Sequence, residues 1–147
     1  MNSNFSVVVI DSNFILLPYQ FKVDYFSQIR FMLEGPLRFI IFQQILNELE
    51  SKKNREPKSI NFSRFLKSGL LYLESNKSKY DISILKDIKK ENENTDDFLL
   101  RKLIDLKNQG ISVYLATNDS ELRKKVKMQH INTIFLRQKK YLSIERT

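Results

Sequence analysis

The sequence predicts an α/β fold, a sandwich of helices around a mostly parallel central sheet. Three observations indicate it. A β-branched run at Val7 to Ile10, flanked by polar residues, is typical of a buried parallel strand. Strand and helix patterns then alternate along the chain. The 147 residues, 41% of them hydrophobic, suit one core, and no internal repeat or linker divides them. We therefore expect a single domain over residues 1–147.

The individual elements follow from apolar spacing and from turn residues. Thr95 is expected to cap a helix that Gly110 closes at its C′ position. Gly69 weakens another helix, because glycine costs about 1 kcal/mol inside helices. Residues 75–94 are polar and lysine-rich, and they could form a short strand or a helical turn. The spacing predicts helices over residues 24–33, 43–53, 62–74, 95–109 and 120–129, and further strands over residues 37–42, 111–116 and 132–136.

Composition limits the chemistry that this chain can perform. It has no cysteine and a single histidine, His130, which leaves almost nothing for a thiolate, zinc or histidine-dependent site. Catalysis would have to use carboxylates, hydroxyls, amides and cations. The net charge of +8 favours a polyanionic partner such as nucleic acid, although a generally lysine-rich composition also explains it. The first six residues are mostly polar and carry no charged side chain, so we expect no signal peptide, no membrane segment and a cytoplasmic protein.

Acidic residues occur where a parallel sheet would bring them together. Asp11 directly follows the first strand, and Asp119 follows the strand over residues 111–116. The carboxyl ends of parallel strands are where open α/β sheets bind ligands. Each aspartate could instead be a helix N-cap, and Asn118 with Glu121 has the spacing of a capping box. Asp96 and Asp97 suit the positive end of a helix, and Glu48 on an amphipathic helix would ordinarily be solvated.

Four segments together resemble the signature of PIN domains: Val8 to Asn13, Leu46 to Glu50, Thr95 to Asp97 and Ala116 to Asp119. The resemblance spans nearly the whole chain. It implies a three-layer α/β/α fold and a metal-dependent endoribonuclease that cuts RNA phosphodiester bonds with metal-activated water. It implies Mg²⁺ or Mn²⁺ as the cofactor. The catalytic metal ligands would be Asp11, Glu48, Asp96 and Asp119, with Asp97 as a further ligand, and the supporting polar groups would be Ser12, Asn13, Thr117 and Asn118.

Within this family the sequence looks most like the archaeal-type branch close to the small-subunit processome nuclease. Three features support this: the segment Asp11 to Phe21, the doubled Asp96-Asp97 pair, and the tail over residues 136–145. That branch implies ribosomal RNA processing or ribosome biogenesis, with an RNA precursor and ribosome-assembly proteins as partners. The VapC-type toxins are more distant relatives, and they would imply an antitoxin partner. A homodimer would be compatible with either role.

The substrate would be held by cations near the acidic residues. Lys52, Lys53 and Arg55 lie near the end of the helix that carries Glu48. Cations beside an aromatic ring suit single-stranded RNA, although a solvated lysine face is the plainer interpretation of any one of them. The residues expected to bind RNA are Arg123, Lys124, Lys127, Arg137, Lys139, Lys140 and Tyr141.

Two other functions compete with this interpretation. A PIN-like module could bind RNA or a protein partner without cutting, although four acidic residues argue for cleavage. A phosphotransfer domain of the haloacid type would need an aspartate where Asn13 stands. A receiver domain would need two acidic residues near its first strand. Neither phosphotransfer pattern is present.

Overall fold

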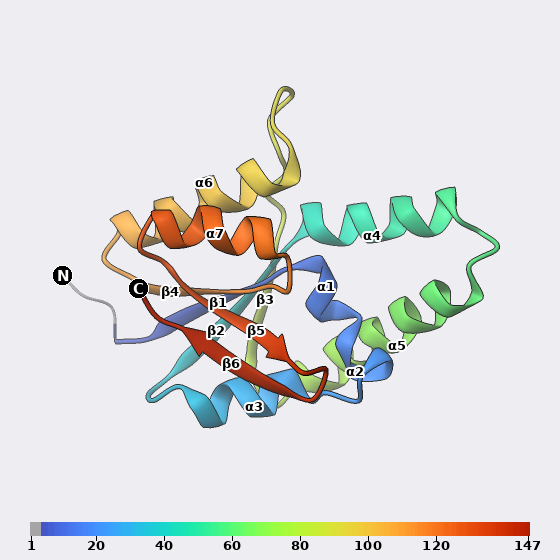
Figure 1. The fold of residues 1–147 in the computed structure, drawn as a ribbon, viewed down its shortest axis with the longest axis horizontal. Coiled ribbons are helices and arrows are strands. Elements are labelled where there is room, and N and C mark those ends of the chain that lie inside the picture. The colour runs from blue at the N-terminus through green and yellow to red at the C-terminus, as the bar shows by residue number, and fades with distance from the viewer. Residues whose placement is uncertain (1–3) are drawn as a thin grey trace.

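A computed structural model describes residues 4–147 and shows a six-stranded sheet with helices packed around it (Figure 1). Residues 1–3, which belong to the N-terminal segment considered above, lie outside the described part. The elements in chain order are β1 (Ser6–Ile10), α1 (Ser12–Ile15), α2 (Leu17–Gln20), α3 (Tyr25–Met32), β2 (Leu37–Phe42), α4 (Gln43–Arg55), α5 (Ile60–Asn76), β3 (Asp81–Leu85), α6 (Thr95–Asn108), β4 (Ser112–Ala116), α7 (Ser120–Met128), β5 (Asn132–Arg137) and β6 (Tyr141–Glu145).

The strand order is β3-β2-β1-β4-β5-β6, and all neighbours are parallel except β5 and β6. The central strand β1 pairs with β2 on one side and with β4 on the other. The chain winds outward from β1 to β3, and then in the opposite direction from β4 to β6. The winding therefore reverses between β1 and β4, and such a switch point opens a crevice at the carboxyl ends of the strands.

Helices cover the sheet in layers. Figure 1 shows α6 and α7 above the sheet and α3 below it, while α4 and α5 extend to the right. The carboxyl ends of β1, β2 and β4 lie on that right-hand side, where α1, α4 and α7 begin. The predicted α/β sandwich with its mostly parallel sheet is confirmed. No helix within residues 4–147 is long and apolar enough to cross a lipid bilayer.

The fold assigns two parts of the chain that the sequence patterns left open. Residues 75–94 contain β3, so the short strand is correct and the helical turn is not. The expected tail after residue 136 forms β6, which pairs antiparallel with β5. Gln138 and Lys139, with φ of 53° and 56°, form the turn between these strands. Left-handed backbone at two consecutive residues other than glycine is uncommon, so the sequence offered little sign of this hairpin.

The N-cap of α6 lies one residue earlier than the sequence predicts. Asn94, not Thr95, is the cap, because the Asn94 side chain accepts a hydrogen bond of 2.8 Å from the backbone N–H of Asp97. Asparagine is as good a cap as any residue, so both residues were chemically suitable. The predicted C-terminal glycine is confirmed, since Gly110 follows the C-cap with a φ of 82°.

The structure explains why residue 69 is a glycine, which helix propensity alone does not. A Cβ atom at this position of α5 would lie 2.0 Å from the carbonyl oxygen of Ile15 at the end of α1. We expect Gly69→Ala to lower the free energy of unfolding by about 2–3 kcal/mol, since backbone must move to admit the methyl group. Propensity alone would instead raise it by about 1 kcal/mol. Urea unfolding followed by circular dichroism measures the sign, with Ser68→Ala in the same helix as the control. A stabilised Gly69→Ala variant would contradict the close approach.

Candidate active site

Asp11 lies at the switch point between β1 and β4. Its backbone N–H donates to the carbonyl of Ala116 at the end of β4, at 3.0 Å. Only 6% of the residue is exposed. Its Oδ1 accepts from the backbone N–H of Ser12 at 2.7 Å, and its Oδ2 accepts from the Thr117 hydroxyl at 2.6 Å. The Asn13 amide also donates to Oδ2, at 3.3 Å. The carboxylate is thus held from both strand ends.

A polar network joins the loops that follow β1 and β4. The Asn13 amide nitrogen donates to the Thr117 hydroxyl at 3.2 Å, and the Asn13 Oδ1 accepts from the backbone N–H of Asn118 at 3.0 Å. The Thr117 hydroxyl also accepts from the backbone N–H of Asp119 at 3.1 Å. Residues 12, 13, 117 and 118, which sequence analysis assigned as supporting groups, therefore either bond Asp11 or shape this junction.

Asp119 both caps α7 and faces the site. Its Oδ1 accepts from the backbone N–H groups of Glu121 and Leu122 at 3.0 and 3.1 Å. The capping box suggested for Asn118 is therefore wrong, and the Asn118 Oδ1 instead accepts from the backbone N–H of Leu136 at 2.7 Å. Among the described residues the Asp119 Oδ2 takes no hydrogen bond. One carboxylate oxygen thus caps the helix, and the other is not used by the cap.

Three aspartates share one electrostatic neighbourhood. Burial raises the pKa of Asp11 to about 6, the hydrogen bonds from Thr117 and Ser12 oppose this, and the negative charges of Asp96 and Asp119 add to it. Burial and the charge of Asp119 also raise the pKa of Asp96, which lies in the first turn of α6. Asp97 beside it is exposed. These carboxylates would repel one another if all were ionised without a counter-cation.

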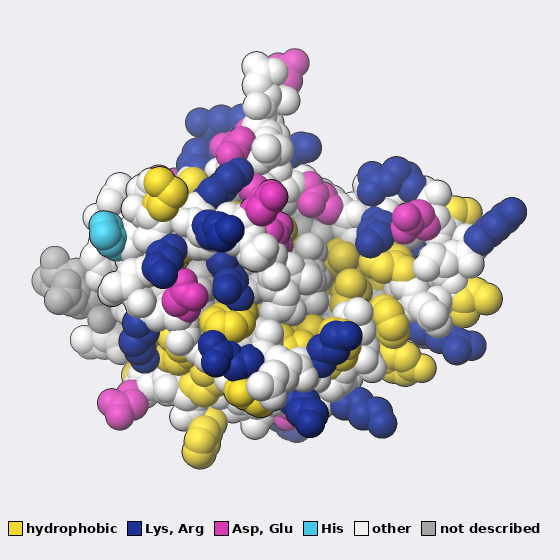
Figure 2. Space-filling view, in the orientation of Figure 1, with side chains coloured by type: hydrophobic (Ala, Val, Ile, Leu, Met, Phe, Trp, Pro, Cys, Tyr) yellow, Lys and Arg dark blue, Asp and Glu magenta, His cyan; other side chains and the backbone are white. Residues whose placement is uncertain are grey.

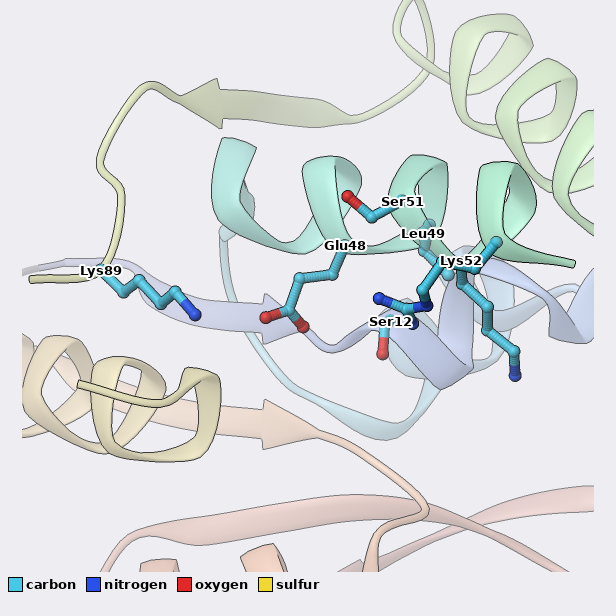
Figure 3. A pocket seen from close by; sticks show the side chains of 7 residues that line it. Ser12, Glu48, Leu49, Ser51, Lys52 and Lys89 are labelled. Carbon is cyan, nitrogen blue, oxygen red and sulfur yellow. The ribbon is translucent and has the colours of Figure 1, made fainter. Parts of the chain in front are cut away.

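Glu48, on α4, approaches the site at Ser12 and is not among the charges that shift the pKa values of Asp11 and Asp96. It lines an open cavity of about 430 Å³ together with Ser12, the residue that follows Asp11 (Figure 3). The amide of buried Gln44 donates to the Glu48 Oε1 at 3.4 Å. Glu50 lines a different groove, between α4 and α5. We call the first space the α4 cavity; its polar lining consists of Ser12, Glu48, Ser51, Lys52, Arg55 and Lys89.

The oxygen atoms at this edge suit a hard divalent cation, although the acidic side chains do not converge on a single metal position. Within residues 4–147, no three His, Cys, Asp or Glu side chains lie close enough to hold one metal ion together. All the donors at this edge are carboxylate, hydroxyl or amide oxygens, which Mg²⁺ and Mn²⁺ prefer. A cation would also relieve the repulsion around the buried Asp11 carboxylate. The ligand atoms and the charge of these residues therefore fit such an ion.

Two of the cations expected to bind RNA are paired with a carboxylate of the same chain. The Arg123 guanidinium lies over the Phe135 ring at 3.9 Å from its centroid. Both Arg123 and Lys127 approach the Glu145 carboxylate of β6, at 4.0 and 3.3 Å. Lys124 is exposed on α7. The other members of the predicted set, Arg137, Lys139, Lys140 and Tyr141, are exposed at the turn between β5 and β6.

Two further lysines lie near the acidic residues: Lys125, which the sequence already places on the helix that follows Asp119, and Lys89, which the sequence does not single out. The positive charge of Lys125 opposes the rise in the pKa of Asp96. Its i,i+4 spacing from Glu121, another neighbour of Asp96, was a usable sign. Lys89 enters the α4 cavity from the segment after β3. No local pattern marked it, because its position depends on contacts with α4.

Acidic and basic side chains occupy different regions of the surface. In Figure 2, acidic side chains gather between α7 and α4, and basic side chains lie on both sides of them. The acidic group therefore coincides with the carboxyl edge of the sheet seen in Figure 1. A polyanion could reach the carboxylates only where basic groups offset their charge.

Comparisons with known proteins agree with this geometry. The sequence model of the PIN domain family matches residues 8–137. Ribonuclease VapC4 of Methanocaldococcus jannaschii is 27% identical over 143 residues, covering 93% of this chain and 95% of that protein.

Two solved structures share the fold. The PIN domain endonuclease Utp24 superposes with a TM-score of 0.67 at 22% identity, covering 96% of this chain and 92% of that one. A domain of a functionally unknown protein from Methanocaldococcus jannaschii has a TM-score of 0.64 at 13% identity, covering 90% and 91%. The match to the family sequence model extends from β1 through β5 and includes all four acidic segments. This chain therefore belongs to the PIN domain family of ribonucleases.

Proposed function

We propose that this chain is a single-domain, metal-dependent endoribonuclease with Asp11, Glu48, Asp96 and Asp119 as its catalytic carboxylates. The observation that carries the proposal is the buried Asp11 carboxylate at the β1–β4 switch point, beside the charges of Asp96 and Asp119. Burying an ionised carboxylate among other carboxylates costs free energy. Such an arrangement is typical of sites that bind a cation or catalyse a reaction.

Mg²⁺ or Mn²⁺ would be held by Asp11, Asp96 and Asp119, with Glu48 and Asp97 at the margin. When bound, such a cation supplies positive charge at the phosphoryl oxygens and lowers the pKa of water. The chain's own residues hold the carboxylates in place. Thr117 and the backbone of Ser12 fix both oxygens of Asp11, while the N-terminus of α7 fixes one oxygen of Asp119. Little reorganisation is then needed when RNA arrives.

A role in ribosomal RNA processing or ribosome biogenesis is our first candidate for the biological substrate. It is supported by the sequence features of the processome-like branch and by the fold shared with the endonuclease Utp24. The second candidate is a VapC-type toxin ribonuclease that pairs with an antitoxin, as the 27% identity to ribonuclease VapC4 suggests. Expression in a host without the partner separates them, because a toxin arrests growth and its Asp119→Asn variant does not.

The cleavage reaction is tested with 5′-labelled single-stranded and structured RNA. We expect internal cuts in Mg²⁺ or Mn²⁺ and none in EDTA, with 5′-phosphate and 3′-hydroxyl ends. Purified protein that binds RNA but shows no metal-stimulated cleavage would instead indicate a non-cleaving PIN-like module.

Asp96 and Asp97 provide a matched pair of neighbours. Asp96 is partly buried and interacts with Asp119, whereas Asp97 is exposed. We expect Asp96→Asn to lower the cleavage rate at least about tenfold more than Asp97→Asn, since only Asp96 shares the field of the buried site. Both variants keep the α6 cap, which uses the backbone N–H of Asp97. Equal losses for the two variants would assign them equal roles.

A further inference from the structure

The α4 cavity contains three cations that have no acidic partner within the described residues. No carboxylate oxygen of residues 4–147 lies within 4.0 Å of the charged nitrogens of Lys52, Arg55 or Lys89. All three residues are exposed. They differ in this from Arg123 and Lys127, which approach Glu145.

Lys89 is brought to the cavity by specific contacts. The side-chain oxygen of buried Gln44 accepts a hydrogen bond of 3.0 Å from the backbone N–H of Lys89. The nitrogen of the same amide donates to Glu48. One buried side chain of α4 therefore places both a lysine and a candidate catalytic carboxylate at the same cavity.

The segment around Lys89 is also anchored to α6 at both ends. The Asp87 carboxylate forms an ion pair with Lys102. The Glu93 carboxylate accepts two hydrogen bonds from Arg101, each of 2.8 Å. A bidentate pair of this kind holds orientation as well as distance. An exposed lysine that merely solubilised the surface would not need such anchoring.

The cations bracket Glu48 along the cavity. Figure 3 shows Lys89 directing its amino group toward Glu48 from one side, while Lys52 lies on the other side, farther along α4. Arg55 lines the cavity one helical turn beyond Ser51. The Lys52 amino group lies over the neutral Phe62 ring at 4.7 Å and, among the described residues, forms no ion pair with a carboxylate.

We propose that Lys52, Arg55 and Lys89 bind backbone phosphates of the RNA on both sides of the bond to be cut, so that the strand runs through the α4 cavity. The inference rests on the proposed function and extends it to the path of the substrate. A phosphodiester chain fits better than a single small anion, because the cations are spread along an open cavity instead of converging on one point. Their contacts would be to phosphates, so they position the strand without reading its sequence.

Salt dependence of binding tests the proposal directly. Full-length protein is titrated in EDTA against two labelled single-stranded RNA oligonucleotides of different sequence at several salt concentrations. Each of Lys52→Gln, Arg55→Gln and Lys89→Gln should raise the Kd several-fold for both sequences. Each should also reduce the slope of log Kd against log salt by about 0.7, the value for one phosphate contact on a single strand. The triple variant should reduce the slope by about 2.

Lys53→Gln is the matched control. The sequence groups Lys53 with Lys52 and Arg55, but the structure separates them: Lys53 carries the same charge on the same helix and lines the groove on the other side of α4, not the α4 cavity. Lys53→Gln should leave the slope of log Kd against log salt unchanged. Thermal unfolding confirms that all variants fold, which is expected because the side chains are exposed.

The outcomes are distinct. If Lys89 only neutralises Glu48, then Lys89→Gln leaves the slope unchanged and the proposal is overturned. An equal reduction by Lys53→Gln would likewise overturn it, since any surface charge would then serve. If the wild type cleaves no RNA, the proposed function fails, yet the binding slopes still decide the strand path. If the wild type cleaves and the triple variant keeps its KM and slope, the path is wrong and the function stands.

Discussion

Asp119→Asn is expected to lower the rate of metal-dependent RNA cleavage at least about 100-fold while leaving the fold intact. The loss follows from removing one negative charge from the three aspartates, since charge stabilisation by a bound divalent ion contributes several kcal/mol to the transition state. The fold is retained because asparagine is as good an N-cap as aspartate. The side-chain oxygen of the substituted asparagine can still accept from the backbone N–H groups that Asp119 now caps. Single-turnover cleavage with saturating protein measures the rate.

Asp119→Ala separates the two roles of this residue. It should lose cleavage to the same extent and also lower the free energy of unfolding by about 1 kcal/mol, because the cap is lost. Unchanged cleavage by Asp119→Asn would remove Asp119 from the catalytic set. A rate loss seen only with Asp119→Ala would show that the residue acts through the helix alone.

Asp11→Asn should abolish cleavage and, in EDTA, make the protein more stable. Burial and the neighbouring aspartates make the ionised Asp11 unfavourable at neutral pH, by roughly 3 kcal/mol for a pKa raised from 3.8 to about 6. The amide carries no charge, but it can accept only one of the hydrogen bonds from Ser12 and Thr117. Losing one such bond costs about 1–2 kcal/mol. The net expectation is a gain of about 1–2 kcal/mol.

Metal addition gives the second half of this test. Wild-type protein should unfold at a higher temperature in Mg²⁺ or Mn²⁺ than in EDTA, because an ion that binds only the folded state stabilises it. Asp11→Asn should lose most of that increase. Asp105→Asn, at an exposed position of α6, is the control and should change neither quantity. An Asp11→Asn variant that is less stable in EDTA would mean that the hydrogen bonds of Asp11 outweigh its charge.

Much of the fold was readable from local patterns. The β-branched run of β1 is buried on both faces because helices cover the sheet above and below, which is the condition that such runs indicate (Figure 1). Asp11 and Asp119 were correctly placed at strand ends, since a helix N-cap directly after a strand has a local signature. The end of α6 at Gly110 was likewise predicted from the local sequence.

Other features could not be read in this way, because two residues distant in sequence decide them. Asn118 looked like a cap, but it bonds Leu136, eighteen residues later. Gly69 looked like a defect in a helix, but it admits the backbone of α1. Both residues have ambiguous local chemistry, and only their distant neighbours give them one role.

The sequence by itself determined the α/β class, the order of the acidic segments and the excess of positive charge. The tertiary structure decided which charges meet. It pairs Arg123 and Lys127 with Glu145 through the β5–β6 hairpin, and it brings Lys89 beside Glu48 through Gln44. The physical reason is the distance along the chain over which each kind of interaction is decided. Caps and apolar periods depend on neighbours within one or two turns, whereas the partner of a charged side chain depends on strand order and on how each loop is anchored.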